Sequence, residues 1–257
     1  MLPLFRFQSL PGTASAGAVP LLQAPEQSPV ALRVTNNLAF AIQPRIIGRK
    51  TAPPIQPGQT RNLEFRMPRA GMYLVTDTLL GPAAAPAGLA AMLDSRRVPD
   101  RSIIAGRDYD EEYLLLYNNS DDRWNAAIDS GMTPDTSVFE PNYHTVNGLA
   151  FPETATDPST LIACKLGQNV LMRWANISPM RQSIHLHGYH ADVIARNNRP
   201  ESFLGPKDTI GLPGQSTADI LLPVTQSGMF PMHPHNLTAV TDNGLYAHGQ
   251  ILMIDAS

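Results

Sequence analysis

Short stretches of apolar and alternating residues, separated by Pro, Gly and Asn, run through the whole chain. Residues 30–34 (VALRV), 62–65 (NLEF) and 218–221 (ADIL) alternate or stay apolar over a few positions. Such stretches predict strands with at least one buried face, and the residues between them predict tight turns. Few segments place apolar residues at helical spacing, and we expect one short helix, over residues 83–93. The pattern predicts an all-β protein.

Three landmarks recur in the same order in the two halves of the chain. VALRVTNNL at 30–38 resembles VLMRWANI at 170–177, PGQT at 57–60 matches PGQS at 213–216, and AGMY at 70–73 matches SGMF at 227–230. A period this long indicates a duplicated domain rather than a solenoid. We place the first domain at residues 1–127, a polar linker at 129–136 and the second domain at 138–257. Each copy predicts a Greek-key β-sandwich or barrel.

Composition narrows the class of protein. Hydrophobic residues make up 43% of the 257 residues and charged residues 16%, as in a globular protein large enough for two cores. The net charge of -3 leaves no basic surface for nucleic acid. Cys164 is the only cysteine, which excludes an intramolecular disulfide and a thiolate cluster. We find no apolar run long enough to span a membrane and no secretory signal in residues 1–20, so a cytoplasmic protein and a processed exported one both stay open.

Histidines concentrate in the second half, where all seven lie at or after residue 144. His185 and His187 are two apart, and so are His233 and His235, so each pair leaves one face of a strand. Either these pairs are polar strand edges, or neighbouring strands bring four imidazoles together at a transition metal. We favour the metal, since two such pairs in one domain are rare by chance. An imidazole site suits copper, zinc, nickel or iron, and argues against calcium or magnesium.

The other three histidines are not part of a His-X-His pair, so their spacing is weaker evidence for metal binding. His190 follows the first pair closely and is expected as an extra ligand or as a partner of a ligand. His248 follows a loop and is expected at the surface or in loop packing. His144 is expected as a partly exposed strand residue.

These motifs resemble those of multicopper oxidases. HLHG at 185–188 and HPH at 233–235 resemble the two metal signatures of that family's last domain, residues 143–152 resemble its entry strand, and residues 71–77 resemble a ligand-bearing strand of its first domain. The resemblance implies cupredoxin domains, copper, and a periplasmic or secreted location. It also implies that His187 and His233 serve one metal, completed by His235 and His185, and that two-domain chains assemble as homotrimers.

This chain departs from the family pattern in both domains. The family's blue-copper cysteine is replaced by Pro234, and residues 181–183 (RQS) stand where a blue-copper histidine is expected. Extending the repeat sets Thr76 opposite His233 and Thr78 opposite His235, and residues 41–46 contain no histidine. The family's trinuclear cluster takes half of its histidines from each of two domains, and this chain supplies one half. We therefore expect no blue copper, no trinuclear cluster, and a histidine-only site.

Three functions follow from this site. The first is a copper-dependent oxidoreductase whose metal binds a small-molecule substrate or O₂ directly, and we lean towards it. The second is a non-catalytic metal-binding or scaffold protein of the cell envelope. The third is a zinc-dependent non-redox enzyme, for which Asp77 is a candidate base, because the repeat sets it opposite Pro234 and near a domain or subunit boundary.

Overall fold

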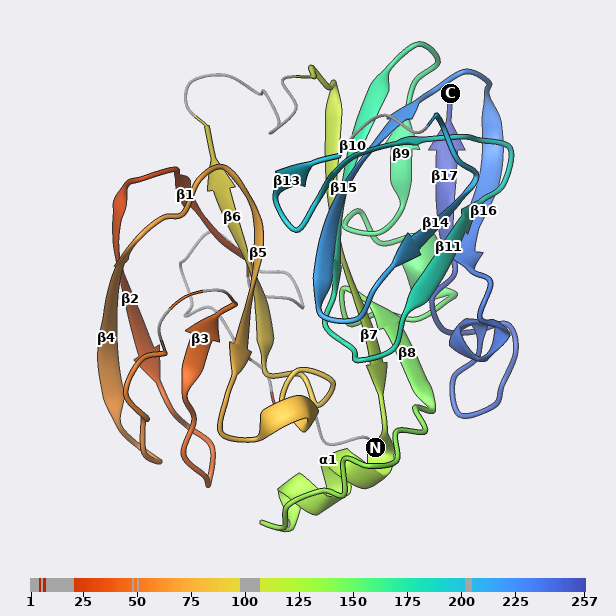
Figure 1. Ribbon diagram of the computed structural model, residues 1–257. Helices are drawn as coiled ribbons and strands as arrows, with labels where there is room; N and C mark the ends of the chain where they lie inside the picture. Colours follow the sequence, from red (N-terminus) through yellow and green to blue (C-terminus); the bar gives the residue numbers. More distant parts are fainter. Residues whose placement is uncertain are drawn as a thin grey trace.

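The computed structural model describes residues 5, 7, 21–47, 49, 51–97, 107–201 and 205–257. In this part of the chain, strands dominate and form two β-sandwiches that lie side by side (Figure 1). The all-β prediction is therefore confirmed. No helix among the described residues is long and apolar enough to cross a membrane.

The first sandwich uses six strands, and a 3₁₀ turn follows its fifth. Its larger sheet has the order β1-β6-β5-β3 and lies over the two-stranded sheet β2-β4. Buried Met67, Val75 and Leu93 fill the space between the sheets. The elements are β1 (Leu21–Pro25), β2 (Pro29–Thr35), β3 (Pro44–Ile46), β4 (Thr60–Arg66), β5 (Gly71–Asp77), the 3₁₀ turn Gly81–Ala83 and β6 (Ala90–Arg96).

The second sandwich is larger. A sheet of order β13-β12-β15-β10-β7-β8 faces a sheet of order β14-β11-β16-β17-β9. Trp174, Ile184 and Met232 are among the fully buried residues between them. The elements are β7 (Glu111–Ser120), α1 (Asp122–Asp129), β8 (Tyr143–Val146), a 3₁₀ turn (Glu153–Ala155), β9 (Ile162–Cys164), β10 (Asn169–Asn176), β11 (Gln182–Leu186), β12 (Asp192–Arg196), β13 (Arg199–Pro200), β14 (Thr209–Leu212), β15 (Ser216–Pro223), β16 (Gly228–Pro234), a 3₁₀ turn (Leu237–Val240) and β17 (Leu252–Ala256).

The same asparagine turn ends the matching strand of each half. Asn36 donates from Nδ2 to the carbonyls of Phe40 and Ile55 and accepts from the amide two residues on. Asn176 repeats the pattern, with Nδ2 donating to the carbonyls of Met180 and Leu212 and Oδ1 accepting two residues on. Both side chains are buried, so each satisfies polar backbone groups that water does not reach. The repeat found in the sequence thus extends to equivalent hydrogen bonds.

Strand β7 lies within the range that the sequence analysis gives to the first domain. In the structure it pairs with β10 in parallel and with β8 antiparallel, so it belongs to the second sandwich. The pairing favours a domain boundary before Glu111, while the domain limits themselves stay a prediction.

The helix expected over residues 83–93 is wrong. A single 3₁₀ turn ends at Ala83, and strand β6 begins at Ala90. Pro86 lacks the N–H that a helix needs. Gly88 has φ +110°, and a Cβ there would lie 2.5 Å from the Phe5 carbonyl oxygen. The alanines therefore pack as a compact turn against the first sandwich instead of extending a helix.

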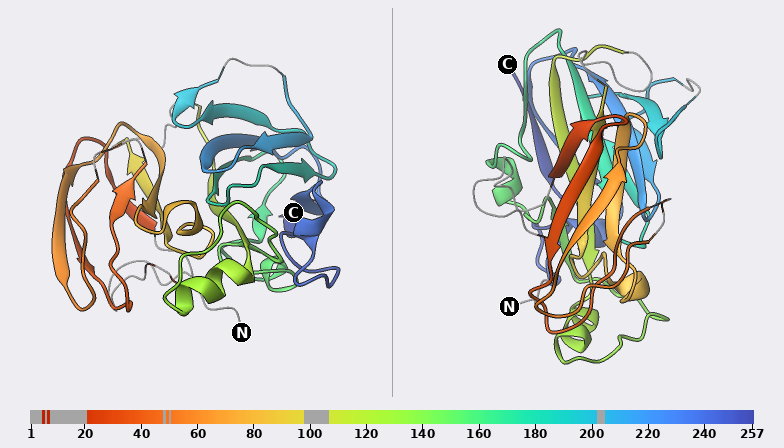
Figure 2. Two further views of the ribbon diagram at one scale, coloured as in Figure 1. Left: turned by 60° about the horizontal axis from the view of Figure 1, so that its bottom comes forward. Right: turned by 90° about the vertical axis from the view of Figure 1, so that its left-hand side faces the viewer.

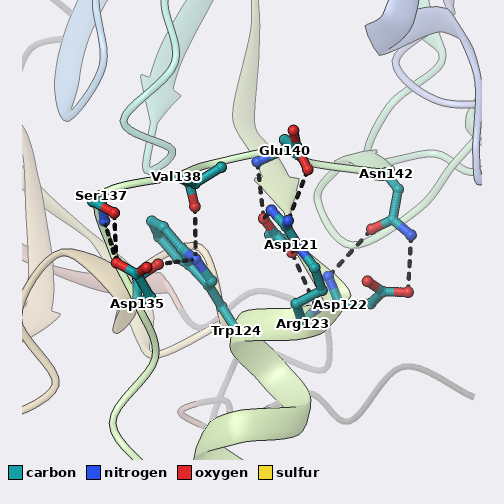
Figure 3. Close-up of polar contacts among 9 residues, drawn as sticks. All are labelled: Asp121, Asp122, Arg123, Trp124, Asp135, Ser137, Val138, Glu140 and Asn142. Carbon is teal, nitrogen blue, oxygen red and sulfur yellow. Dashed lines mark hydrogen bonds and ion pairs between the residues drawn. The ribbon is translucent and has the colours of Figure 1, made fainter.

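Helix α1 was missed by the sequence analysis, and a side-chain cap begins it (Figure 3). Asp121 accepts a hydrogen bond from the Arg123 amide at 3.0 Å, as an N-cap does. Trp124 and Ile128, one turn apart, are buried against the alanine-rich turn. The Trp124 indole donates to the carbonyls of Asp135 and Val138. An Asp before an apolar pair spaced by four was the available signal, but the helix is short and its tertiary contacts hold it.

Candidate metal centre

The two histidine pairs lie on neighbouring strands of the second sandwich. His185 on β11 is directly opposite His233 on β16. The residues just before them, Ile184 and Met232, face the core with no exposed surface. Because alternate residues of a strand face opposite sides, the histidines lie on the outer face of the sheet. His187 directly follows the end of β11.

The four rings form one group. The ring centroid of His185 lies 4.7 Å from that of His187 and 4.6 Å from that of His235. The rings of His187 and His233 are 5.1 Å apart. His187 and His235 are exposed, while His185 and His233 are half-buried, so the group is open to solvent. Among the described residues, however, no three His, Cys, Asp or Glu side chains are arranged as a formed metal site.

Hydrogen bonds to carbonyl oxygens define the protonation of two rings. The Nδ1 atom of His185 lies 3.1 Å from the Asp208 carbonyl oxygen, and that of His233 lies 3.0 Å from the Pro234 carbonyl oxygen. A carbonyl oxygen only accepts, so in both rings Nδ1 carries the hydrogen and donates. In the neutral form of these rings Nε2 is then unprotonated, and that is the form that binds a metal.

His187 and His233 face each other through their Nε2 atoms, which are 3.0 Å apart. In that neutral form Nε2 of His233 accepts, and His187 Nε2 donates to it. Imidazole nitrogens lie about 2.0–2.1 Å from a bound zinc ion, so two nitrogens on one ion of this size are roughly 3 Å apart. This pair of nitrogens therefore fits a metal ion, once His187 loses its Nε2 hydrogen to the other ring nitrogen or to solvent.

The electrostatics of the group favour a neutral His187 ring. Partial desolvation lowers the pKa of the largely exposed His187 ring, and the neighbouring imidazoles of His185, His233 and His235 lower it further. A proton on any of these rings would repel charge on the others. Neutral imidazole is the metal-binding form, so the clustering that lowers this pKa also favours metal uptake over protonation.

The other histidines lie elsewhere. His190 is exposed, and no ring contact joins it to the four within the described part of the chain. His248 is half-buried, and its backbone amide donates to the Val240 carbonyl. The expectation that His144 is partly exposed is wrong: it is buried, and its Nδ1 lies 2.8 Å from Nδ2 of Asn119. Burial lowers the pKa of His144 to about 4. The loop beyond β16 covers it, and Asp242 in that loop accepts from its backbone amide.

The first sandwich shows what replaces the histidines at the equivalent place. Arg45 on β3 is directly opposite Thr76 on β5, as His185 is opposite His233. Asp77 is buried, and its carboxylate accepts from the backbone amides of Gln43, Leu79 and Leu80. The Asp77 carboxylate therefore holds the end of β5 in place within this chain.

One amide side chain, Gln182, lies in the segment where the resemblance expects a blue-copper histidine, and a second, Gln250, is buried with it. Gln182 is fully buried, and its Nε2 donates to Oδ1 of Asn119 at 2.5 Å. Gln250, also fully buried, donates to the carbonyls of Asn118 and Thr145. Both amide groups reach Oδ1 of Asn119, so neutral groups fill this part of the interior.

From the sequence, Asp208 and Thr209 are ordinary loop residues near the histidine motifs, but in the structure both contact the ring of His185. Thr209 Oγ1 lies 3.0 Å from His185 Nδ1. Their place beside the ring depends on the pairing of β14 with β11, for which the local sequence carries no signal.

The chain is similar to known copper proteins. A family model described as multicopper oxidase matches residues 110–251, which is more than half of the chain. No curated protein matches the sequence significantly. Among solved structures, the blue copper oxidase from Nitrosomonas europaea has a TM-score of 0.82 and 20% identity, over 93% of this chain and 77% of that one.

Two further solved structures show the same similarity. The multicopper oxidase mgLAC has a TM-score of 0.78 and 19% identity, over 94% of this chain and 77% of that one. The copper nitrite reductase from Nitrosomonas europaea has a TM-score of 0.73 and 16% identity, over 94% of this chain and 85% of that one. At such identities the likeness establishes the fold.

Proposed function

This chain belongs to the multicopper oxidase family, and we propose that it is a copper-dependent oxidoreductase with a histidine-only site on the outer face of its second sandwich. His187 and His233 would hold the ion, with His185 and His235 completing the site. The observation that carries the proposal is the 3.0 Å approach of the two Nε2 atoms within a group of four closely spaced imidazole rings. Copper held by imidazoles alone supplies one-electron chemistry without a thiolate.

The residues around the site would leave it open to a small substrate. His187 and His235 are exposed, so a small molecule reaches the ring nitrogens from solvent. On metal binding, His187 would release or shift the hydrogen that its Nε2 donates to His233. No thiolate lies beside the site, since Cys164 is buried in the core on another strand. Electrons would therefore have to come from the substrate at the metal itself.

A homotrimer belongs to the same proposal. The histidine face is turned away from the chain's own first sandwich, which packs against β10 and β15 of the opposite sheet (Figure 1). A first domain that covers the site would come from another copy, through its surface at Gln43, Arg45 and Thr78; Thr76, which the repeat sets opposite His233, is buried. Half-buried Arg45, with no acidic partner in the described residues, is the charge that this surface offers. A closed ring also avoids filament growth. An exported location rests on the family alone.

A copper titration tests the metal site. Dialysed protein should bind one to two Cu²⁺ per chain tightly, and His187→Ala or His233→Ala should abolish the binding. His248→Ala is the matched control and should bind as the wild type does. Three tight coppers per chain, or full binding by both variants, would refute the assignment. Tight zinc with weak copper would favour the zinc enzyme instead.

Spectra test the ligand type. With Pro234 at the cysteine position, the copper-loaded protein should lack intense absorption at about 600 nm, and its EPR spectrum should show the wide parallel splitting of a nitrogen-ligated site. An intense blue band in pure protein would contradict a histidine-only site.

Light scattering tests the homotrimer. It should report about three times the chain mass, and a strict monomer would favour the scaffold function.

A further inference from the structure

Three adjacent strands place a threonine in line with two of the histidines. His185 on β11 is directly opposite Thr209 on β14 and, on its other side, His233 on β16. Residues directly opposite one another in antiparallel strands share a face and bring their side chains close together. The sheet therefore places the His185 ring between the Thr209 hydroxyl and the second histidine pair.

Two oxygens receive the Nδ1 hydrogen of His185. They are the Asp208 carbonyl oxygen at 3.1 Å and the Thr209 hydroxyl oxygen at 3.0 Å. The Asp208 carbonyl already accepts the Leu186 backbone amide at 2.8 Å, so it is shared between two donors. The Thr209 hydroxyl is the side-chain acceptor. Its hydrogen bond fixes the orientation of the His185 ring and keeps the hydrogen on Nδ1.

His235 has no comparable support. Its backbone amide donates to the Ser183 carbonyl, and no hydrogen bond to its ring occurs among the described residues. Its ring lies 4.6 Å from that of His185 and is exposed. Two hydrogen bonds thus orient the ring of His185 before any metal arrives, whereas none among the described residues orients that of His235.

We infer that Thr209 is a positioning residue that keeps His185 in its Nδ1–H form and aims its Nε2 towards His233, which makes His185 the third ligand of the metal site. The relevance to copper rests on the proposed function, but the position of the hydrogen on His185 does not. Hydrogen-bond partners of metal-binding histidines fix the ring and its tautomer, and their loss weakens metal binding about 10–100-fold.

Thr209→Val tests the inference, because valine keeps the β-branched shape and removes the acceptor. Thr209→Ser restores the hydroxyl. Thr35→Val is the matched control, since Thr35 is a strand threonine in the first sandwich with one hydroxyl hydrogen bond, to Thr60 at 2.9 Å. Circular dichroism and the thermal midpoint of the metal-free proteins show whether each variant folds.

The first measurement needs no metal. Long-range ¹⁵N–¹H NMR spectra of the metal-free wild type should show His185 as the Nδ1–H form. In Thr209→Val the two tautomers of that ring should mix. Thr209→Ser should restore the wild-type pattern, and Thr35→Val should leave it unchanged. A folded Thr209→Val protein with an unchanged His185 pattern would overturn the inference while leaving the proposed function intact.

The second measurement is copper affinity by competition with a chelator. Thr209→Val should bind Cu²⁺ about 10-fold more weakly, at the lower end of the usual range because Asp208 still accepts. Thr209→Ser and Thr35→Val should stay within about 2-fold of the wild type. An equal loss in the serine variant would overturn the role of the hydroxyl. A wild type that binds no copper but shows the predicted tautomer would refute the proposed function and leave the positioning role standing.

Discussion

The guanidinium of Arg173 lies between the two sandwiches and pairs with carboxylates from both. It is buried, and it lies 2.5 Å from Asp94 of β6 and 3.0 Å from Asp219 of β15. Glu112 of β7 lies 3.7 Å away. Around these charges, Met72 and Leu74 of the first sandwich pack on Leu116 and Ala175 of the second, where the two sheets meet (Figure 2). Replacing Arg173 by methionine keeps the volume and removes the charge.

The two carboxylates differ in what they keep after this change. Asp94 retains Arg96 at 2.6 Å and Gln23 at 2.8 Å. Asp219, only 3% exposed, keeps no cation among the described residues. Leaving one member of a buried ion pair without its partner costs about 3–5 kcal/mol. We expect Arg173→Met to lower the free energy of unfolding by this amount, which is a large part of the stability of a typical domain.

Urea unfolding followed by far-UV circular dichroism measures the loss. Arg33→Met is the matched control, because Arg33 holds the repeat-equivalent position on β2 but is exposed, and it should change stability by less than about 0.5 kcal/mol. Adding Asp219→Asn to Arg173→Met removes the unpaired charge and should recover at least about 1 kcal/mol. A loss below about 1 kcal/mol in Arg173→Met would refute the reasoning.

Two further predictions concern buried polar groups. Burial lowers the pKa of His144 to about 4, whereas in the unfolded chain the pKa of histidine is about 6.5. As the pH falls, the unfolded chain therefore binds the proton first. The free energy of unfolding should then fall by up to about 3 kcal/mol between pH 6.5 and 4. Unfolding free energies at several pH values should show a flatter profile in His144→Gln than in exposed His190→Gln, and equal profiles would contradict the account. Asn36→Ala leaves buried backbone groups without partners and should cost about 2 kcal/mol in urea unfolding. Exposed Asn37→Ala should cost less than about 0.5 kcal/mol, and similar losses in both would count against the shared turn.

Local pattern was enough to predict the fold class and the place of the histidines. The alternation at 30–34 and 218–221 became β2 and β15, and the repeated Asn became equivalent turns at Asn36 and Asn176. The spacing of two in each histidine pair determines the face of a strand, whatever that strand pairs with. For the same reason the grouping of His185 and His187 followed from the sequence alone.

Pairing between distant segments decided the rest. Nothing near Glu111 shows that β7 joins β10, and nothing near His144 shows that a loop a hundred residues later buries it. The alanine-rich segment before β6 has helical composition, yet the close approach of Phe5 to Gly88 requires a turn. The partners of Arg173 and the hydroxyl beside His185 come from strands far away in the chain. A strand's face is a property of its own residues, whereas its neighbours depend on which segments together bury the most apolar surface and leave the fewest polar groups unpaired.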